Sequence, residues 1–248
     1  MIKCHLDEEP RAYITSMRIL SAVTLPVDLF GVYCIVAKSP PIMKEYSRLL
    51  LIYQILATLT DTWTNMMFIP VAFLPFPITY HVGLVLPRVH MKYCYMQIAW
   101  LCLISTTMGA VVQLFVFRWQ SLLMNDHPLR LRKKVIKAIV TTNFILFNAA
   151  IIGAGFTMPE RTNEIKPLYA ERYSCVADID EMQGMLYFDM AEMRRLYLIT
   201  STEGALVVMV TFVLVYLTFR SFRHTDVSEK TVELQKRYLI SLILQVSG

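Results

Sequence analysis

The chain has 248 residues, of which 56% are hydrophobic and only 17% are charged, and its formal net charge is +5. A soluble domain carries about 25% charged residues and an apolar share of about 45–50%. The imbalance excludes a water-soluble protein with a single core, and the scarcity of charge excludes an intrinsically disordered chain.

Five stretches of the sequence are long and apolar enough to cross a lipid bilayer. Each has roughly 20 residues, which at about 1.5 Å per residue spans a hydrocarbon core of about 30 Å. They cover residues 14–37, 49–74, 95–117, 138–156 and 197–219, and a shorter stretch covers 238–248. We therefore predict an all-α integral membrane helical bundle. Residues 1–248 are expected to form one transmembrane domain with five full helices and the start of a sixth.

The Lys and Arg residues indicate how the bundle is oriented. Residues 38–48, 118–137 and 220–237 together hold 14 of them, whereas residues 157–196 carry eight acids. Loops on the cytosolic side of a membrane are rich in Lys and Arg. The pattern predicts an external N-terminus. It also assigns the basic surplus to contact with membrane lipid, so we expect no nucleic-acid partner.

The five cysteines divide between the predicted helices and the predicted outer side. Cys34 and Cys102 fall inside helices, where a small packing role is expected. Cys4, Cys94 and Cys175 lie on the outer side, where disulfides persist. A bridge between Cys94 and Cys175 would hold the long acidic outer loop over the bundle, and we favour it. Three outer cysteines also permit pairings with Cys4.

Three ionisable side chains fall within predicted spans, where they are costly and are functional candidates: Asp28, Asp61 and Glu203. Asp61 and Asn65 are four residues apart and are expected to share a helix face. Asp61 is either a proton, sodium or switch site or an interhelical hydrogen-bonding group. The hydrogen-bonding role is slightly favoured for Asp28 and Glu203, because each could also face a wet outer vestibule.

Prolines and aromatic residues mark the first two predicted spans. Pro26 and Pro70 fall within them and are expected to bend them. Phe73, Phe76 and Tyr80 lie near the outer end of the second span. They could line a ligand pocket, although such residues more often form an interfacial aromatic belt.

The sequence offers no enzymatic or metal-binding motif. It contains none of the H-E-x-x-H, G-x-S-x-G, P-loop or G-x-G-x-x-G patterns. Its five histidines fall in tails or loops and never pair four residues apart. We expect neither an enzyme nor a cofactor or metal site.

Three segments of the sequence have a residue order typical of one receptor family, and prolines, glycines and aromatic residues mark the first two. Residues 26–46 read PVDLFGVYCIVAKSPPIMKEY, residues 68–83 read FIPVAFLPFPITYHVG and residues 231–245 read TVELQKRYLISLILQ. With Asp61, these segments resemble the nematode serpentine chemoreceptors of class h (Srh) and the related class i, of the Str superfamily. The resemblance covers most of the chain but matches residues 157–196 poorly.

This resemblance implies a seven-helix, G-protein-coupled-receptor-like protein that crosses the plasma membrane several times. Such a receptor detects an external small molecule and passes a helix rearrangement to a heterotrimeric G protein. The ligand would sit among the outer halves of the second, third and fifth helices. The candidate ligand contacts are Phe73, Phe76, Tyr80 and Glu203.

The cytosolic end of the third predicted helix reads LFVFRWQ. The resemblance matches Arg118 to the arginine near the end of this helix in the family, and Trp119 replaces the family's tyrosine. Val116 and Phe117 stand where the family has an acid or polar partner. Arg118 is expected to face the G protein or to be a snorkelling anchor at the inner leaflet. The other basic residues expected to face the G protein are Arg132, Lys133 and Arg220.

The resemblance also implies more helix than the chain contains. A seven-helix receptor needs the rest of the sixth helix and a seventh, which residues 238–248 do not supply. We expect the chain to be truncated relative to the family. The 248-residue form, expressed alone, is expected to be retained internally and to give no ligand-dependent response.

Two other functions are compatible with the sequence. One is a small transporter or channel that uses Asp28, Asp61 and Glu203 as a polar path, although no inverted repeat is visible. The other is a non-signalling partner that pairs with full-length receptors.

Overall fold

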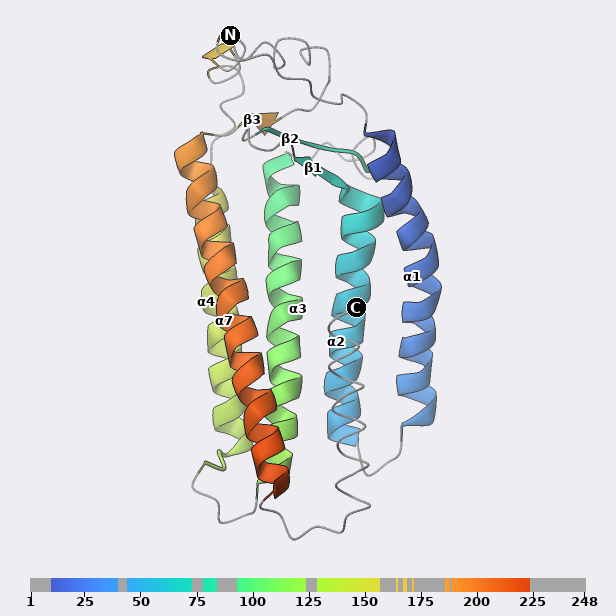
Figure 1. Cartoon of the computed structure of the whole chain (residues 1–248), viewed down its shortest axis with the longest axis vertical. Helices are drawn as coiled ribbons and strands as arrows, with labels where there is room; N and C mark the ends of the chain where they lie inside the picture. The colour runs from blue at the N-terminus through green and yellow to red at the C-terminus, as the bar shows by residue number, and fades with distance from the viewer. Residues whose placement is uncertain are drawn as a thin grey trace.

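The computed structural model describes residues 10–39, 44–72, 78–83, 93–123, 129–156, 164, 167–168, 171, 186–187 and 189–223. Within these ranges, five long helices lie side by side and alternate in direction (Figure 1). They are α1(Arg11–Lys38), α2(Lys44–Thr62), α3(Tyr93–Leu122), α4(Lys133–Phe156) and α7(Met190–Arg223).

Four helices of the described part are long and apolar enough to cross a membrane: Arg11–Lys38, Tyr95–Ser121, Lys133–Phe156 and Met193–Arg220. Their outward faces carry exposed apolar side chains, such as Phe30 of α1 and Phe212 of α7. A surface of this kind suits contact with lipid. α2 is not among the four, so five full spans remain a prediction.

The second helix ends earlier than the apolar run that predicts it. α2 passes at Trp63 into a π-helical turn, η2(Trp63–Phe68), and Ile69 has left-handed backbone geometry. Residues Pro70–Ala72 form β1. The predictions of a helix through residue 74 and of a proline bend inside it are therefore wrong. Proline obstructs helical geometry in the residue before it and cannot continue the helical hydrogen bonding, which favours a helix end here.

A three-stranded antiparallel sheet covers the end of the bundle at which α2 finishes (Figure 1). It consists of β1(Pro70–Ala72), β2(Ile78–His81) and β3(Leu186–Tyr187), in that order. In its register Val71 pairs with Tyr80, and Thr79 pairs with Leu186. Because β3 comes from the long segment between α4 and α7, strand pairing attaches this segment to the β1–β2 hairpin. No pattern in the sequence predicted these strands.

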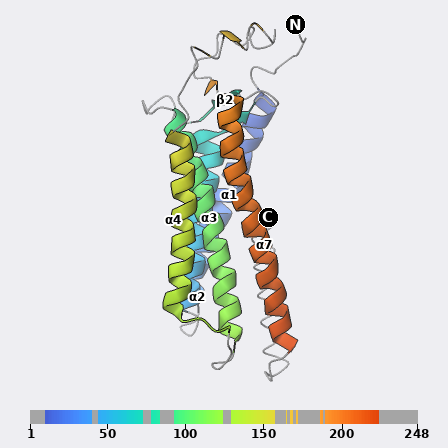
Figure 2. The same ribbon diagram turned by 90° about the vertical axis from the view of Figure 1, so that its left-hand side faces the viewer.

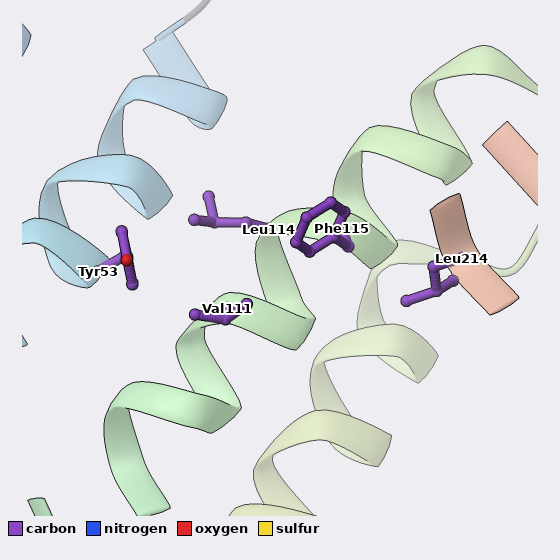
Figure 3. Close-up of a cluster of buried hydrophobic side chains, with 5 residues drawn as sticks. All are labelled: Tyr53, Val111, Leu114, Phe115 and Leu214. Atoms are coloured by element: carbon purple, nitrogen blue, oxygen red, sulfur yellow. The ribbon is translucent and has the colours of Figure 1, made fainter. Parts of the chain in front are cut away.

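The central helix of the bundle is α3, which packs against α2, α4 and α7. Figure 2 shows α7 inclined relative to α3 and α4. The buried core joins three helices: Val111 and Leu114 of α3 point toward Tyr53 of α2 (Figure 3), and Phe115 of α3 and Leu214 of α7 belong to the same buried cluster. The core therefore couples the positions of α2 and α7 through α3.

The two ends of the bundle differ in what they contain (Figure 1). The sheet and the last turn of η2 lie at one end, which we call the outer end. The C-terminal ends of α1, α3 and α7 and the first turns of α2 and α4 lie at the opposite, inner end. The helix ends adjoining the three Lys- and Arg-rich segments therefore meet at the inner end.

Candidate functional site

The outer end of α2 is shaped by an unusual backbone at residues 63–69. The N–H of Ile69 donates to the carbonyl oxygen of Thr64, five residues earlier, at 3.0 Å, which is the bond of a π-turn. Ile69 has a φ of 31°, a left-handed conformation that is costly for a β-branched residue. Its side chain is only 1% exposed, so packing around it offsets the strain.

The β1–β2 hairpin returns directly onto this turn. The N–H of Val82 donates to the carbonyl oxygen of Ile69 at 3.1 Å. A Cβ atom on Gly83 would lie 1.8 Å from the carbonyl oxygen of Met67. Glycine is therefore required at this position, because the two backbones touch without room for any side chain.

Side chains from two neighbouring helices bind the same segment. The indole N–H of Trp100 in α3 donates to the hydroxyl of Thr64 at 2.8 Å, and its ring centroid lies 5.8 Å from that of Phe68. The hydroxyl of Tyr13 in α1 donates to the carbonyl oxygen of Pro70 at 3.0 Å. The outer end is thus a junction of α1, η2, the hairpin and α3.

Of the three predicted aromatic ligand contacts, only the backbone of Tyr80 is among the described residues. Phe73 and Phe76 lie outside the described residues. Tyr80 lies in β2, opposite Val71 of β1, and its side chain is not among those described. Tyr80 therefore belongs to a strand of the hairpin, a position that the helical pattern did not indicate.

The polar residues of α1 and α2 occupy different environments. The carboxylate of Asp28 accepts a hydrogen bond from the side-chain amide of Gln54 at 3.1 Å, which links α1 to α2. Asn65 is buried, whereas Asp61 is exposed. Asp61 lies in the last turn of α2, whereas Asn65 lies in the wider π-helical turn η2, so the four-residue spacing does not bring both to the same surroundings.

Glu203 is buried between α7 and α3. It is 5% exposed, and its carboxylate accepts a hydrogen bond from the hydroxyl of Ser105, at 2.5 Å. On the other side of α3, the hydroxyls of Thr60 and Thr107 lie 2.8 Å apart and link α3 to α2. Side-chain hydrogen bonds therefore join α3 to both neighbours. A buried carboxylate of this kind holds helices in register and can also receive a polar group of a ligand.

Arg118 lies inside the bundle at the inner end. It is 7% exposed, and its guanidinium carbon lies 5.9 Å from the ring centroid of Tyr46 in α2, a cation–π distance. The same ring stacks on Phe117, with centroids 6.1 Å apart. A snorkelling anchor would extend along the lipid surface. The burial of Arg118 does not fit that alternative.

The other basic residues predicted at this end are exposed. Lys133 is the first residue of α4 and Arg132 directly precedes it, and Arg220 stands near the end of α7. Lys133 forms an ion pair with Glu45 of α2 at 2.5 Å. Such an exposed pair contributes little to stability. Its main consequence is that it links the first turns of α2 and α4.

Comparison with known families decides what kind of protein has this architecture. A family model described as the serpentine type 7TM GPCR chemoreceptor Srh matches residues 8–247. The chain belongs to this family. No curated protein and no solved structure matches it. The Srh chain is accordingly a multi-pass membrane protein of the seven-helix chemoreceptor class, and that class is not one of enzymes.

The cysteines of this Srh chain are only partly described. Cys34 in α1 and Cys102 in α3 lie within helices, as predicted, and both are free thiols. Cys4 and Cys175 lie outside the described residues, as does the side chain of Cys94. The Cys94–Cys175 bridge therefore stays a prediction.

Several residues that contact the predicted site residues or shape the two ends of the bundle were not predicted from the sequence of this Srh chain. They are Tyr46 at the inner end, Ser105 and Trp100 in α3, and Gly83 after the hairpin. A serine, tyrosine or tryptophan within an apolar run gives no local signal, because its partner comes from a distant helix. Gly83 does have a local signal in the sequence, since a glycine that ends a proline-rich segment indicates a close approach of two backbones.

Proposed function

We propose that this Srh chemoreceptor detects an external small molecule at the plasma membrane and passes a helix rearrangement to a heterotrimeric G protein. The observation that carries the proposal is the buried Ser105–Glu203 hydrogen bond between α3 and α7, in a chain of a chemoreceptor family. A ligand that alters this bond would change how the two helices pack. The buried core that joins α3 to α7 extends toward the inner end.

The ligand site in this proposal lies among the outer halves of α2, α3 and α7, beneath the sheet. Glu203 would contact a polar group of the ligand, and Phe73, Phe76 and Tyr80 would supply aromatic surface. A site with one charged group among apolar side chains is typical of small-molecule pockets. The junction of η2 with the hairpin would form its outer wall.

A polar pathway would connect this site to the inner end. Asp28, Asp61 and Asn65 are proposed as polar groups whose hydrogen bonds differ between the resting and active packings. The Asp28–Gln54 bond supports this role, because it links α1 to α2 within the apolar part of the bundle. Hydrogen bonds between membrane helices are individually modest, about 0.6 kcal/mol on average, so they can exchange.

The membrane arrangement is part of the proposal. We propose that α2 and η2 together form one more full crossing, in addition to those of α1, α3, α4 and α7. The two elements cover residues 44–68 and run beside α1 and α3 along the bundle. The N-terminus would then be external and the inner end cytosolic. There Arg118, Arg132, Lys133 and Arg220 would meet the G protein or acidic lipid headgroups.

The experiment that tests the proposal is a calcium assay in cells that carry a promiscuous G-protein α subunit. The receptor, expressed from its natural transcript, is exposed to a panel of small water-soluble and volatile compounds. We expect at least one compound to give a response, and we expect Glu203→Gln to shift its half-maximal concentration by about tenfold or abolish the response. Ser201→Ala is the matched control, because Ser201 is an exposed hydroxyl residue of the same helix.

Two results would contradict this function. One is an ionic current in voltage-clamped cells that needs no G protein and disappears with Asp61→Asn, which would favour a channel or transporter. The other is a surface-expressed receptor that gives no response to any compound but alters the responses of co-expressed relatives. That result would favour a non-signalling partner.

A further inference from the structure

Three consecutive residues at the start of α2 contact three different helices at the inner end. Glu45 forms the ion pair with Lys133 of α4. The hydroxyl of Ser47 donates to the hydroxyl of Ser39, the C-terminal cap of α1, at 2.8 Å. Tyr46, between them, turns into the bundle toward α3. The first turn of α2 is therefore held in place from three sides, and Tyr46 is its inward-facing member.

The ring of Tyr46 contacts two adjacent residues of α3. Phe117 stacks on it with an interplanar angle of 25°, and the guanidinium of Arg118 lies over it. The negative face of an aromatic ring attracts a cation, and the attraction strengthens where water is excluded. Arg118 is nearly buried, so this contact operates in surroundings where it is strong.

We propose that Tyr46 is a positioning residue for Arg118, whose guanidinium it holds between α2 and α3 in the conformation described here. This inference rests on the proposed function in one respect. The release of Arg118 toward a cytosolic partner is the step that the ring would control. The position of the guanidinium itself is a physical property of the chain and can be measured without any signalling.

A simpler role for Tyr46 would be to fill space, because it also packs against the core cluster around Tyr53, Leu114 and Phe115. The two roles predict different responses to substitution. Filling space depends on the volume and shape of the side chain. Holding a cation depends in addition on the electron density of the ring.

The experiment measures how fast phenylglyoxal modifies Arg118 in the full chain embedded in lipid nanodiscs, with peptide mass spectrometry as the readout. Exposed Arg132 serves as the internal reference. We expect Arg118 to react more slowly than Arg132 in the unsubstituted protein. Tyr46→Leu should accelerate its modification by about 2- to 30-fold, the range that corresponds to losing a cation–π contact. Tyr46→Phe keeps the ring and should leave the rate unchanged.

Two further variants keep the test decisive. Tyr53→Leu removes another tyrosine from the same helix and core, two turns away, and should leave the modification of Arg118 near its original rate. Fluorinated phenylalanines placed at position 46 keep the shape of Phe while weakening the negative face of the ring. The rate should therefore rise with each added fluorine, even if Tyr46→Leu does not fold.

Three outcomes would overturn the inference. The first is equal reactivity of Arg118 and Arg132 in the unsubstituted protein. The second is an acceleration by Tyr53→Leu as large as that by Tyr46→Leu. The third is a rate of Arg118 modification that does not change with fluorination at position 46. None of these outcomes depends on a ligand or a G protein. A silent receptor in the calcium assay would therefore count against the proposed function and leave this inference standing.

Discussion

Glu203 shows how one hydrogen bond accommodates a carboxylate inside an apolar bundle. Charged groups in such surroundings are tolerated when polar partners face them. Ser105 supplies a hydroxyl from α3, and both residues are buried. The pair therefore contributes to stability as well as to the proposed ligand site, and the two contributions can be separated by substitution.

We predict that Ser105→Ala lowers the unfolding free energy by about 1–2 kcal/mol, because it leaves a buried acceptor without its donor. Glu203→Gln should cost less, since the amide oxygen still accepts from Ser105. The measurement is thermal unfolding in detergent micelles, with Ser201→Ala as the control. Equal melting temperatures for Ser105→Ala and Ser201→Ala would contradict the prediction.

Two glycines of α4 offer a matched comparison at the residue scale. A Cβ on Gly155 would lie 2.4 Å from the Cγ1 atom of Ile98 in α3, whereas a Cβ on Gly153 would have no neighbour within 4 Å. Alanine favours a helix over glycine by about 1 kcal/mol. The same substitution should therefore have opposite effects two residues apart.

We predict that Gly153→Ala leaves stability unchanged or raises it, whereas Gly155→Ala lowers it by about 1–3 kcal/mol through overpacking. Ile98→Ala removes the obstructing atoms, so the double variant should recover part of the loss from Gly155→Ala. Melting temperatures of all four variants in micelles provide the check. The close approach of α3 and α4 at Gly155 would be refuted by a stabilised Gly155→Ala protein.

At the scale of elements, the outer end of α2 depends on its contact with the hairpin. η2 and the residues after β2 meet backbone to backbone at Met67 and Gly83. Ile69 remains in a left-handed conformation because the fold around it supplies buried contacts. Backbone strain of this kind persists only where surrounding structure determines it. The turn and the hairpin are therefore expected to lose their order together.

We predict that Gly83→Ala destabilises the protein by more than about 2 kcal/mol, because backbone atoms cannot move aside as a flexible side chain can. Hydrogen exchange should increase at residues 63–72 before it increases in α4. Gly153→Ala serves as the control for adding a methyl group elsewhere. Unchanged exchange at residues 63–72 would show that this contact does not hold the turn.

For the whole molecule, the testable property is its orientation in the membrane. None of the five asparagines begins an Asn-x-Ser/Thr acceptor, so the chain offers a clean background for glycosylation mapping. The basic inner end and the acidic segment between α4 and α7 predict opposite compartments.

We predict that Ile165→Thr, which creates an acceptor at Asn163, leads to glycosylation in microsomes. An acceptor created at Asn125 by His127→Thr with Pro128→Ala should stay unmodified. A shift in gel mobility that glycosidase reverses is the measurement. Modification at Asn125 but not at Asn163 would invert the proposed topology.

Several parts of the fold and site could be predicted because their signals are local. Runs of apolar residues predict α1, α3, α4 and α7, since a bilayer requires long apolar helices whatever their neighbours. A charge within such an apolar run is conspicuous, so the sequence also indicates Asp28 and Glu203 as candidate residues. The different surroundings of Asp61 and Asn65 were not predictable. A π-turn results from packing between elements, and no residue type in the sequence indicates it.

The sequence by itself determined the membrane class, the family and the positions of most helices, because each of these follows from hydropathy and residue order along the chain. Only the tertiary structure decided that α2 ends in a π-turn, that β3 joins the hairpin and that Tyr46 faces Arg118. Each of these features depends on groups that are distant in sequence. Their free energy comes from close packing and hydrogen bonding between elements, which exist only once the helices have assembled.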